Sequence, residues 1–349
     1  MKGDIDSGDD PEHQTSVTPP PRGDLQNAHA QARLLKRDRK PWGQSHGILI
    51  VDKPAGQTSH DVVNQARRCF RTRRIGHAGT LDPMATGVLV LLLGEATKLS
   101  SLLTGQSKEY LAEVTFGQST DTLDAEGVSL KRVQLANNWL NRGDLDSALV
   151  AERDRRLQLP PAVSAIKVDG ERAYKKARRG ESVELEPRDI EVHDLRVASL
   201  DADKVQLRLS VSKGYYVRAL ARDLGDRLAV PSHLSSLRRV RSGNFSIEEA
   251  TAWPPPNRGK PKLIGIHQAV RQALPSIDLS ADERQKVHHG QALLMSELET
   301  PLPASAHKGV FGAFYQDKEQ ALLNMSEDGT LLVQRGFRLP SPDSEEGQK

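Results

Sequence analysis

The sequence GHAGTLDP at residues 76–83, followed by VLVLLL at residues 88–93, is the stretch from which the fold of this chain can be worked out. The second run is short, aliphatic and bounded by Gly87 and Gly94, and this pattern predicts a β-strand buried on both faces. A loop joined to such a strand is rigidly held, so we expect Asp82 at a fixed position beside the core. A carboxylate there costs free energy unless it is hydrogen-bonded or paired with a cation. Asp82 is therefore a candidate functional residue.

An aspartate before a proline is also a common turn former, because its side chain bonds nearby backbone amides. The residues around Asp82 favour a functional role over this structural one. His77 stands at the entrance of the loop, and five arginines precede it, namely Arg67, Arg68, Arg71, Arg73 and Arg74. A positively charged segment leading to a carboxylate is typical of a protein that brings a polyanionic substrate to a nucleophile or base.

The composition limits the classes of protein to which this chain can belong. Its 349 residues are enough for two ordinary domains, and its net charge is only +3, so nucleic-acid binding must be argued from clusters of charge. The single cysteine, Cys69, excludes an internal disulfide and is typical of a reducing compartment. We find no apolar run long enough for a membrane span and no secretory signal, so we expect a cytoplasmic protein with no membrane partner.

The pattern along the chain predicts four segments. Residues 1–45 are polar and are expected to form a disordered N-terminal tail. Residues 46–264 mix strand-like and helix-like runs without a regular βαβ alternation, which predicts an α+β fold with a mixed, largely antiparallel sheet and flanking helices. Residues 265–340 contain short strand-like runs between turns, which predict a small β-rich domain, and residues 341–349 are expected to be a flexible C-terminus.

Within the larger segment, several individual elements can be predicted. A strand is expected at residues 47–53, where Pro54 ends it, and a helix with an acidic cap is expected from Thr58-Ser59 to about Phe70. Further strands are expected at residues 109–116, 189–199 and 204–212, and further helices at 172–179 and 217–228.

Two more clusters carry side chains that suit chemistry on a nucleotide. The sequence KGYYVR at residues 213–218 offers aromatic rings and a fixed cation, and Tyr110 offers another ring on a strand soon after the Asp82 loop. Each has an ordinary explanation when taken singly: Tyr110 packs in a sheet, and Arg218 is a charge at a helix end.

Together these segments resemble the TruB-type tRNA pseudouridine synthases. The resemblance runs from about Gly47 to about Ala250 and is carried by blocks that occur in the same order: GILIVDKP (47–54), GHAGTLDP (76–83) with Gly87, GEATK (94–98), KEY (108–110), GQSTDT (117–122), PPAVSAIK (160–167), ARRG (177–180), SKGYYVR (212–218) and LRR (237–239). Val163 departs from the family, which often has an aromatic residue at this position. The chain beyond residue 265 is more loosely similar to the small RNA-binding, PUA-like domain of the family.

The resemblance implies a reaction and a set of roles. A uridine at position 55 in the T-loop of tRNA would be flipped out of its stack and isomerised to pseudouridine. Asp82 would be the catalytic carboxylate, attacking the base or acting at the ribose, and this choice stays open. Arg218 would pair with Asp82 and orient it. Tyr110 would stack under the base and help to remove the proton from C5.

The resemblance also implies substrate-binding residues. His77 would fill the space left by the flipped base, and Tyr216 would line the same pocket. The remaining implied contacts to the RNA are Lys53, Arg67, Arg68, Arg71, Arg73, Arg74, Arg178 and Arg179. Phosphate contacts of this kind position an RNA without reading its sequence.

The implied partner is the T-arm of tRNA, bound by a monomer without a guide RNA. The reaction is an isomerisation without net redox change, so no cofactor and no metal are expected. Three alternatives remain open: a guide-RNA-dependent synthase of the dyskerin type, a non-catalytic tRNA-binding chaperone, and a nucleoside hydrolase or glycosidase. The last of these normally needs two carboxylates facing the bond, and only Asp82 stands out in the sequence.

Overall fold

The computed structural model describes residues 45–164, 167–168, 170–173, 176, 179, 181, 185–256, 259–302 and 309–337. The expected tail, apart from its last residue, lies outside this part of the chain. So do the expected flexible C-terminus, Arg178 and most of the expected basic helix at 172–179. Arg172 itself belongs to a short strand, β9 (Glu171–Arg172), rather than to a helix.

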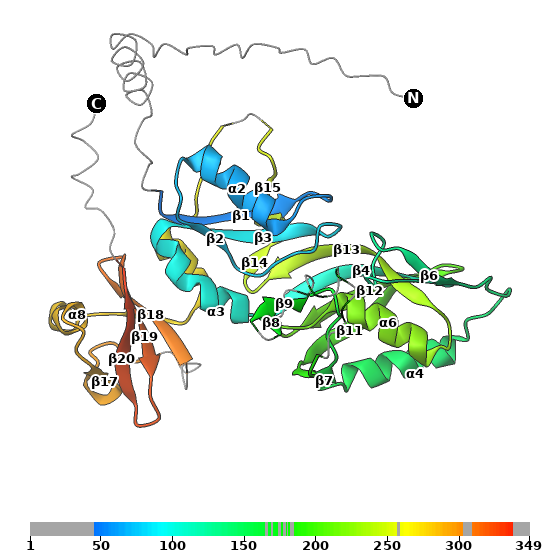
Figure 1. Cartoon of the computed structure of the whole chain (residues 1–349). Helices are drawn as coiled ribbons and strands as arrows, with labels where there is room; N and C mark the ends of the chain where they lie inside the picture. The colour runs from blue at the N-terminus through cyan, green and yellow to red at the C-terminus, as the bar shows by residue number, and fades with distance from the viewer. Residues whose placement is uncertain are drawn as a thin grey trace, which may run out of the picture. The chain divides into compact units, whose positions relative to one another are not determined.

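Nine strands between residues 47 and 252 form one sheet (Figure 1). Its strands are β1 (Gly47–Lys53), β2 (Ile75–His77), β3 (Thr86–Leu93), β4 (Lys108–Phe116), β11 (Val192–Leu200), β12 (Lys204–Val211), β13 (Ser232–Ser242), β14 (Phe245–Ser246) and β15 (Thr251–Ala252). The order is β11-β12-β4-β13-β3-β1-β15, with β2 paired to β3 and β14 to β13. Only the β13–β3 and β1–β15 pairs are parallel. The predicted α+β class with a mixed, largely antiparallel sheet is confirmed.

Strand β3 is buried on both faces, as its aliphatic run predicts. Leu89, Leu91 and Leu93 pack into one apolar cluster together with buried side chains of α2 and α6. Val88, Val90 and Leu92 point the other way, into a second cluster. Each fully buried aliphatic side chain contributes roughly 1.5–3 kcal/mol to the free energy of folding. The strand that follows the Asp82 loop is therefore firmly anchored.

Helix α2 (Ser59–Phe70) begins and ends where its local sequence predicts. Thr58 is the N-cap, and a capping box joins its hydroxyl and backbone to Asp61. The helix buries one face against the sheet and ends at Arg71, whose φ of 51° is left-handed. Ser59 in its first turn reaches the Asp82 loop through its hydroxyl. The helix thus helps to hold the loop in place.

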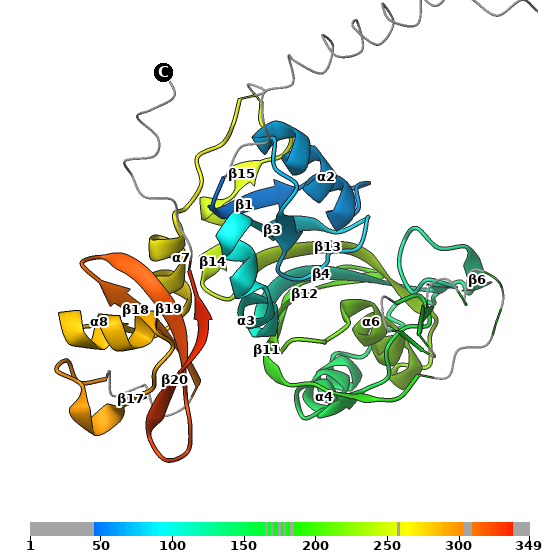
Figure 2. The ribbon, with the colours of Figure 1, turned by 60° about the vertical axis from the view of Figure 1, so that its left-hand side comes forward.

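Helix α6 (Val217–Arg227) packs on β13 and β4, and α4 (Arg142–Arg153) packs on α6 and β11. Figures 1 and 2 show α4 and α6 side by side. The sequence predicted α6 but not α4. The remaining elements before residue 250 are η1 (Gly94–Leu99), α3 (Ser100–Gly105), β5 (Gln118–Thr120), β6 (Ser129–Arg132), β7 (Leu157–Gln158), β8 (Lys167–Val168), β10 (Arg188–Asp189) and η2 (Ile247–Glu249).

A second sheet of five strands occupies the C-terminal part of the described chain, in the order β16-β18-β19-β20-β17. The strands of this sheet are β16 (Ser276–Asp278), β17 (Leu293–Leu294), β18 (Gly309–Tyr315), β19 (Lys318–Met325) and β20 (Thr330–Gly336). The helices of the same region are α7 (Ile266–Ala273), α8 (Ala281–His288) and η3 (Met295–Glu297). Phe314 and Leu322 of this sheet share an apolar cluster with Ile48 and Ile50 of β1. The β-rich character predicted for this region is confirmed, and the domain limits stay a prediction.

No helix in the described ranges is both long enough and apolar enough to cross a membrane.

Candidate active site

Asp82 lies in the loop between β2 and β3, and the backbone of this loop is held at every step from residue 79 to residue 83. Each of these five carbonyls accepts a hydrogen bond. The Arg239 guanidinium donates to the carbonyls of residues 79 and 80, and the Ser59 hydroxyl donates to that of residue 81. The Ala85 amide donates to the carbonyl of residue 82, and the Gly56 amide and the Lys53 ammonium both donate to that of residue 83. Gly79 has a φ of 100°, which glycine adopts without strain. A loop with this many fixed points presents Asp82 in one geometry, as a catalytic group requires.

The carboxylate of Asp82 pairs with Arg218 in the first turn of α6, 136 positions later in the chain. Arg218 Nε lies 2.9 Å from Asp82 Oδ2, and Nη2 donates to Oδ1 at 3.3 Å. Arg218 is buried, whereas 35% of the Asp82 side chain is exposed. The cation is hidden from solvent while the carboxylate can be reached by a substrate. The structure therefore brings together the pair that the sequence led us to expect.

The other contacts of Arg218 fix its orientation. Nη1 lies 3.5 Å from Asp124 Oδ2 and donates to the carbonyl of Thr122 at 3.0 Å. Nη2 also donates to the carbonyl of Val163 at 3.0 Å, a contact that does not depend on the unusual side chain at this position. Asp124 is buried and accepts further hydrogen bonds from the Thr122 hydroxyl and the Glu126 amide. The sequence analysis missed Asp124, although the matched block at 117–122 ends only two residues before it.

The turn before α6 is anchored by two buried polar residues, Gln158 and Glu152, that the sequence analysis also missed. The side-chain amide of Gln158 holds Tyr216 at both backbone groups, accepting from its N–H at 2.8 Å and donating to its carbonyl at 3.2 Å. The Tyr215 hydroxyl donates to Glu152 at 2.8 Å. Burial raises the pKa of Tyr216, an effect that the charges of Arg188 and Arg218 oppose and that of Asp82 reinforces.

Tyr110 and His77 occupy different surroundings. Tyr110 is buried on β4, where its register partners are Leu209 of β12 and Arg239 of β13. His77 ends β2 and is half-buried, and its Nδ1 has no hydrogen-bond partner among the described residues. Burial, followed by the charge of Arg239, lowers the pKa of His77, so its ring is neutral at pH 7. A neutral ring suits contact with a base better than contact with a phosphate.

Lys53 takes a position that differs from the expected contact with substrate. Its side chain is fully buried, and its ammonium donates to the carbonyls of Pro54, Gln57 and Pro83 at 2.8, 2.6 and 3.1 Å. These three bonds match the three N–H donors of a lysine. Burial lowers the pKa of Lys53 to about 8. Lys53 supports the loop beside Asp82 and presents no charge at the surface.

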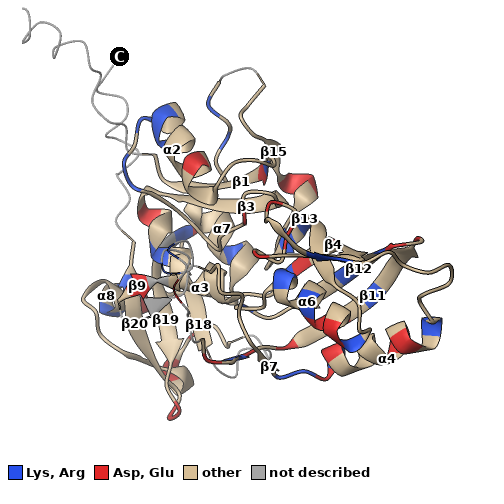
Figure 3. Ribbon diagram, turned by 45° about the vertical axis from the view of Figure 1, so that its right-hand side comes forward, with Lys and Arg blue, Asp and Glu red and all other residues tan. Residues whose placement is uncertain are grey.

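The five arginines of residues 67–74 do not form one continuous strip. Arg67 is bound within the protein, donating to Asn64 Oδ1 and to the carbonyl of Ile75. Arg74 pairs with Glu95 at 2.7 Å. The other three are exposed around the end of α2, where Figure 3 shows blue ribbon: Arg68, Arg71 and Arg73.

The charge of Arg179 is largely compensated. It forms a bidentate pair with Glu171, at 2.8 and 2.7 Å, and its Nε lies 2.6 Å from Glu181 Oε1. These two carboxylates raise the pKa of Arg179 above its ordinary value. Arg179 has less charge to offer a phosphate than its sequence context predicted.

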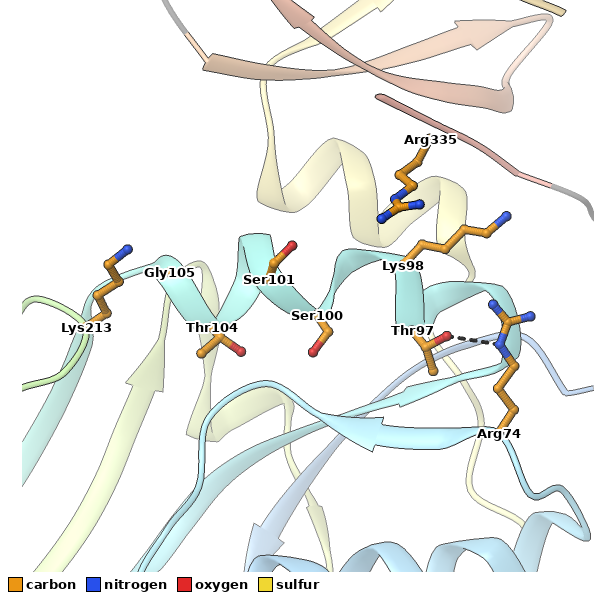
Figure 4. Close-up of a pocket in the computed structure, with 9 residues that line it drawn as sticks. All are labelled: Arg74, Thr97, Lys98, Ser100, Ser101, Thr104, Gly105, Lys213 and Arg335. Atoms are coloured by element: carbon orange, nitrogen blue, oxygen red, sulfur yellow. Dashed lines mark hydrogen bonds between the residues drawn. The ribbon is translucent and has the colours of Figure 1, made fainter. Parts of the chain in front are cut away.

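A cavity of about 620 Å³ runs along α3 toward the second sheet (Figure 4). Its lining combines four cations and four hydroxyls, namely Arg74, Lys98, Lys213, Arg335, Thr97, Ser100, Ser101 and Thr104, together with Gly105. Figure 4 shows Arg74, Lys98 and Arg335 near η1, and Lys213 at the far end of α3, beside Gly105. None of the lining residues is acidic. The cavity therefore suits an anion, and it leads to the turn that carries Tyr216 and Arg218.

Within the described ranges, no group of three or more His, Cys, Asp or Glu side chains is placed to hold a metal ion. Asp124 brings a second carboxylate to Arg218, but it is buried and turned toward that guanidinium. A glycosidase would need two carboxylates that face the bond to be cut. The pair of Asp82 and Asp124 does not fit that alternative.

The chain is similar to several known proteins. Residues 67–217 match the N-terminal domain of the TruB family pseudouridylate synthases. A protein of Mycobacteroides abscessus named tRNA pseudouridine synthase B is 45% identical over 72% of this chain and 86% of its own length. A protein of Thermobifida fusca with the same name is 43% identical over 81% of this chain and 96% of its own length.

A solved structure of an H/ACA RNP bound to a substrate RNA containing 2′-deoxyuridine shares the fold, with a TM-score of 0.63 and 22% identity, over 84% of this chain and 86% of that one. This chain belongs to the TruB family of pseudouridine synthases, which are isomerases.

Proposed function

We propose that this protein isomerises uridine 55 in the T-loop of tRNA to pseudouridine. The observation that carries the proposal is the pair formed by Asp82, partly exposed on a fixed loop, and the buried Arg218. The names of the relatives support tRNA as the substrate. The proposed enzyme acts on tRNA as a monomer in the cytoplasm, without a guide RNA.

The reaction breaks the C–N glycosidic bond of the uridine and forms a C–C bond at the same sugar. In this proposal the Asp82 carboxylate attacks either the base or the ribose, and Arg218 orients it for that step. Because Arg218 is itself held by Asp124 and two backbone carbonyls, the carboxylate is oriented before substrate arrives. Little reorganisation is then needed during the reaction.

The target base must leave its stack before Asp82 can reach it, at a cost of a few kcal/mol. We assign His77 to the space that the flipped base vacates, because its neutral, half-buried ring resembles a base more than a charge. Tyr216 lines the pocket beside Asp82. Tyr110 stacks under the base and helps to take the proton from C5.

The sugar–phosphate backbone of the RNA needs cations outside the reaction site. The cavity along α3 supplies them, because Lys98, Lys213 and Arg335 line it together with Arg74. Contacts of this kind position the RNA without reading its bases. We therefore place the T-arm along this cavity, with the target uridine at the Lys213 end.

The test uses the full chain and an unmodified tRNA transcript, with no other RNA added. Pseudouridine is mapped by carbodiimide labelling and primer extension. We expect product at position 55 with the wild type and none with Asp82→Asn, which should still bind tRNA. Asp121→Asn, which changes an exposed carboxylate in a nearby turn, is the matched control and should remain active.

Two outcomes would overturn the proposal. A guide-dependent synthase would form product only after a guide RNA is added. A tRNA-binding chaperone would bind the transcript without forming any product, and Asp82→Asn would then behave like the wild type.

A further inference from the structure

Arg239 of β13 is a fully buried arginine that pairs with none of the described carboxylates. Its side chain is 1% exposed, and its guanidinium is bonded entirely to backbone carbonyls. Nε donates to Val88 at 2.7 Å, Nη2 donates to Gly79 at 3.0 Å, and Nη1 donates to Thr80 at 3.3 Å. Two of these three carbonyls belong to the loop that carries Asp82.

A buried cation without a counter-charge is costly, and at this position its hydrogen bonds to backbone carbonyls are what offset that cost. The reason for an arginine here therefore lies in the groups that it bonds. The neighbouring arginine is an instructive contrast, because Arg238 is 38% exposed and forms a bidentate pair with Asp52 at 2.8 and 3.0 Å. Both arginines belong to the LRR block at 237–239, to which no role has yet been assigned.

The shape of the guanidinium explains why the residue is arginine. Its planar fork holds three nitrogen donors in fixed directions, so one side chain can bond carbonyls on two separate segments of backbone, residues 79–80 and Val88. A lysine carries its donors on a single nitrogen, so it can bond only carbonyls that converge on one point, as those around Lys53 do.

The chain is built to bring Arg239 close to the loop. Its register partner on β3 is Gly87, which has a φ of 100°, and a Cβ at Gly87 would lie 2.1 Å from the backbone oxygen of Arg239. A larger residue would push β13 away at this point. Tyr110 is the register partner of Arg239 on the other side. Arg239 therefore shares one row of the sheet with Tyr110 and with Gly87, the second residue of β3.

The charge of Arg239 lowers the pKa of two neighbouring side chains. Burial is the largest cause of the lowered pKa of His77, and Arg239 is the second largest. The same two causes, in the same order, lower the pKa of Lys108 to about 8. His77 stands at one end of the loop, two residues before Gly79, the first of the two residues that the guanidinium bonds. The guanidinium therefore lies against the backbone of the Asp82 loop while remaining out of contact with solvent.

We propose that Arg239 is a positioning residue for the proposed reaction: by holding the carbonyls of Gly79 and Thr80, it fixes where the carboxylate of Asp82 lies. The proposal rests on the proposed role of Asp82. When Arg239 is replaced, two consecutive carbonyls lose their donor and the loop gains freedom. A displacement of a catalytic group by about 1 Å can lower the rate by about 100-fold.

The test compares Arg239→Lys and Arg239→Met with the adjacent Arg238→Lys. For each protein, kcat and KM on tRNA, tRNA affinity and the thermal midpoint are measured, with assays run well below the midpoint. We expect both Arg239 variants to bind tRNA within about twofold of the wild type and to lose about 10- to 100-fold in kcat. Arg238→Lys should change kcat by less than about twofold. Methionine removes the buried charge while lysine keeps one donor nitrogen, so the two variants perturb folding in different ways, and kcat is compared for each variant whose thermal midpoint shows that it is folded.

Hydrogen exchange separates positioning from general support of the sheet. Exchange of the Ala85 amide, which closes the loop on the carbonyl of Asp82, should become faster in the Arg239 variants, while β4 amides should be unchanged. The proposal is overturned if a folded Arg239 variant keeps kcat within about twofold, or if exchange rises equally across the sheet. Should the wild type form no pseudouridine, the proposed function fails, and the exchange pattern still shows whether Arg239 holds the loop.

Discussion

The Asp82 loop and the cavity along α3 are two charged regions of one protein, and they are built in opposite ways. The loop exposes a single carboxylate and has every carbonyl from residue 79 to residue 83 bonded. The cavity gathers four cations on long side chains from separate segments, along with hydroxyl groups. Glu95, which is buried behind the lining, pairs with two of these cations, Arg74 and Lys98, whereas Lys213 and Arg335 reach the cavity from other segments.

This difference teaches how the two regions should respond to change. A site that depends on geometry fails when one anchor is lost, because the reacting groups then leave their alignment. A surface that depends on net charge loses affinity in small, nearly equal steps, because each phosphate contact contributes separately. Substitutions in the loop should therefore act on kcat, and substitutions in the cavity should act on tRNA affinity and its dependence on salt.

After Asp82→Asn, the largest effect is expected from Arg218→Lys. A lysine keeps the charge but cannot contact both oxygens of Asp82 while also bonding the carbonyls of Thr122 and Val163. We expect kcat to fall by at least about 100-fold, measured in single-turnover assays with saturating tRNA. Arg222→Lys is the matched control, because Arg222 lies one turn later on α6 and pairs with Asp223. Equal activity of the two variants would contradict the geometric account of the site.

A smaller loss is expected from Asp124→Asn. Asp124 lies 3.5 Å from Arg218 and acts on Asp82 only through it, and asparagine can still accept from the Thr122 hydroxyl. We expect kcat to fall about tenfold, equivalent to about 1.4 kcal/mol, with tRNA affinity unchanged. The same assays at saturating tRNA measure this. A loss as large as that of Arg218→Lys would mean that Asp124 is itself one of the reacting groups.

The sequence predicted the parts of this site that depend on local pattern. The aliphatic run of β3, the capped start of α2 and the glycines around Asp82 each act within a few residues, so they can be recognised without the fold. The pairing of Asp82 with Arg218 joins residues 136 positions apart, and it was expected only from the resemblance to a family.

The residues that were missed or misplaced depend on distant partners. Gln158 holds Tyr216, and Arg239 holds residues 79 and 80, through backbone groups that any residue possesses, so no pattern of side chains reveals them. The resemblance implied that Lys53 and Arg67 contact the RNA, but both side chains donate to backbone carbonyls of the protein itself. Whether a charged side chain faces solvent or a backbone carbonyl is decided by the folded chain around it.

The cavity is tested by removing two of its cations together, in Lys213→Gln with Arg335→Gln. We expect tRNA affinity to fall and the slope of log affinity against log salt to decrease in magnitude by roughly 2, since each phosphate contact contributes about 0.9. The kcat at saturating tRNA should not change. Arg142→Gln with Lys286→Gln removes two cations outside the cavity and should leave the slope unaltered. An unchanged slope in the first pair would exclude the cavity as a phosphate contact.

The smallest effect concerns Lys108, a buried cation near the loop, whose pKa is lowered to about 8 by burial and by Arg239. Its ammonium donates to the carbonyls of Thr104 and Gln106. Below pH 8 the lysine is protonated in both the folded and the unfolded protein. Between about pH 8 and 10.5 the unfolded chain binds the proton more tightly, so this residue raises the free energy of unfolding as the pH increases.

Lys108→Met removes this dependence, and it therefore isolates the contribution of one buried cation. Urea denaturation at pH 7.5 and pH 10 should show the wild type gaining about 1–2 kcal/mol relative to the variant, because each pKa unit corresponds to about 1.4 kcal/mol and residual solvent screens part of it. Lys131→Met, at an exposed position on β6, should show no such gain. A gain of equal size at Lys131 would mean that the titration reflects the overall charge of the protein, and the contrast between buried and exposed cations would lose its basis.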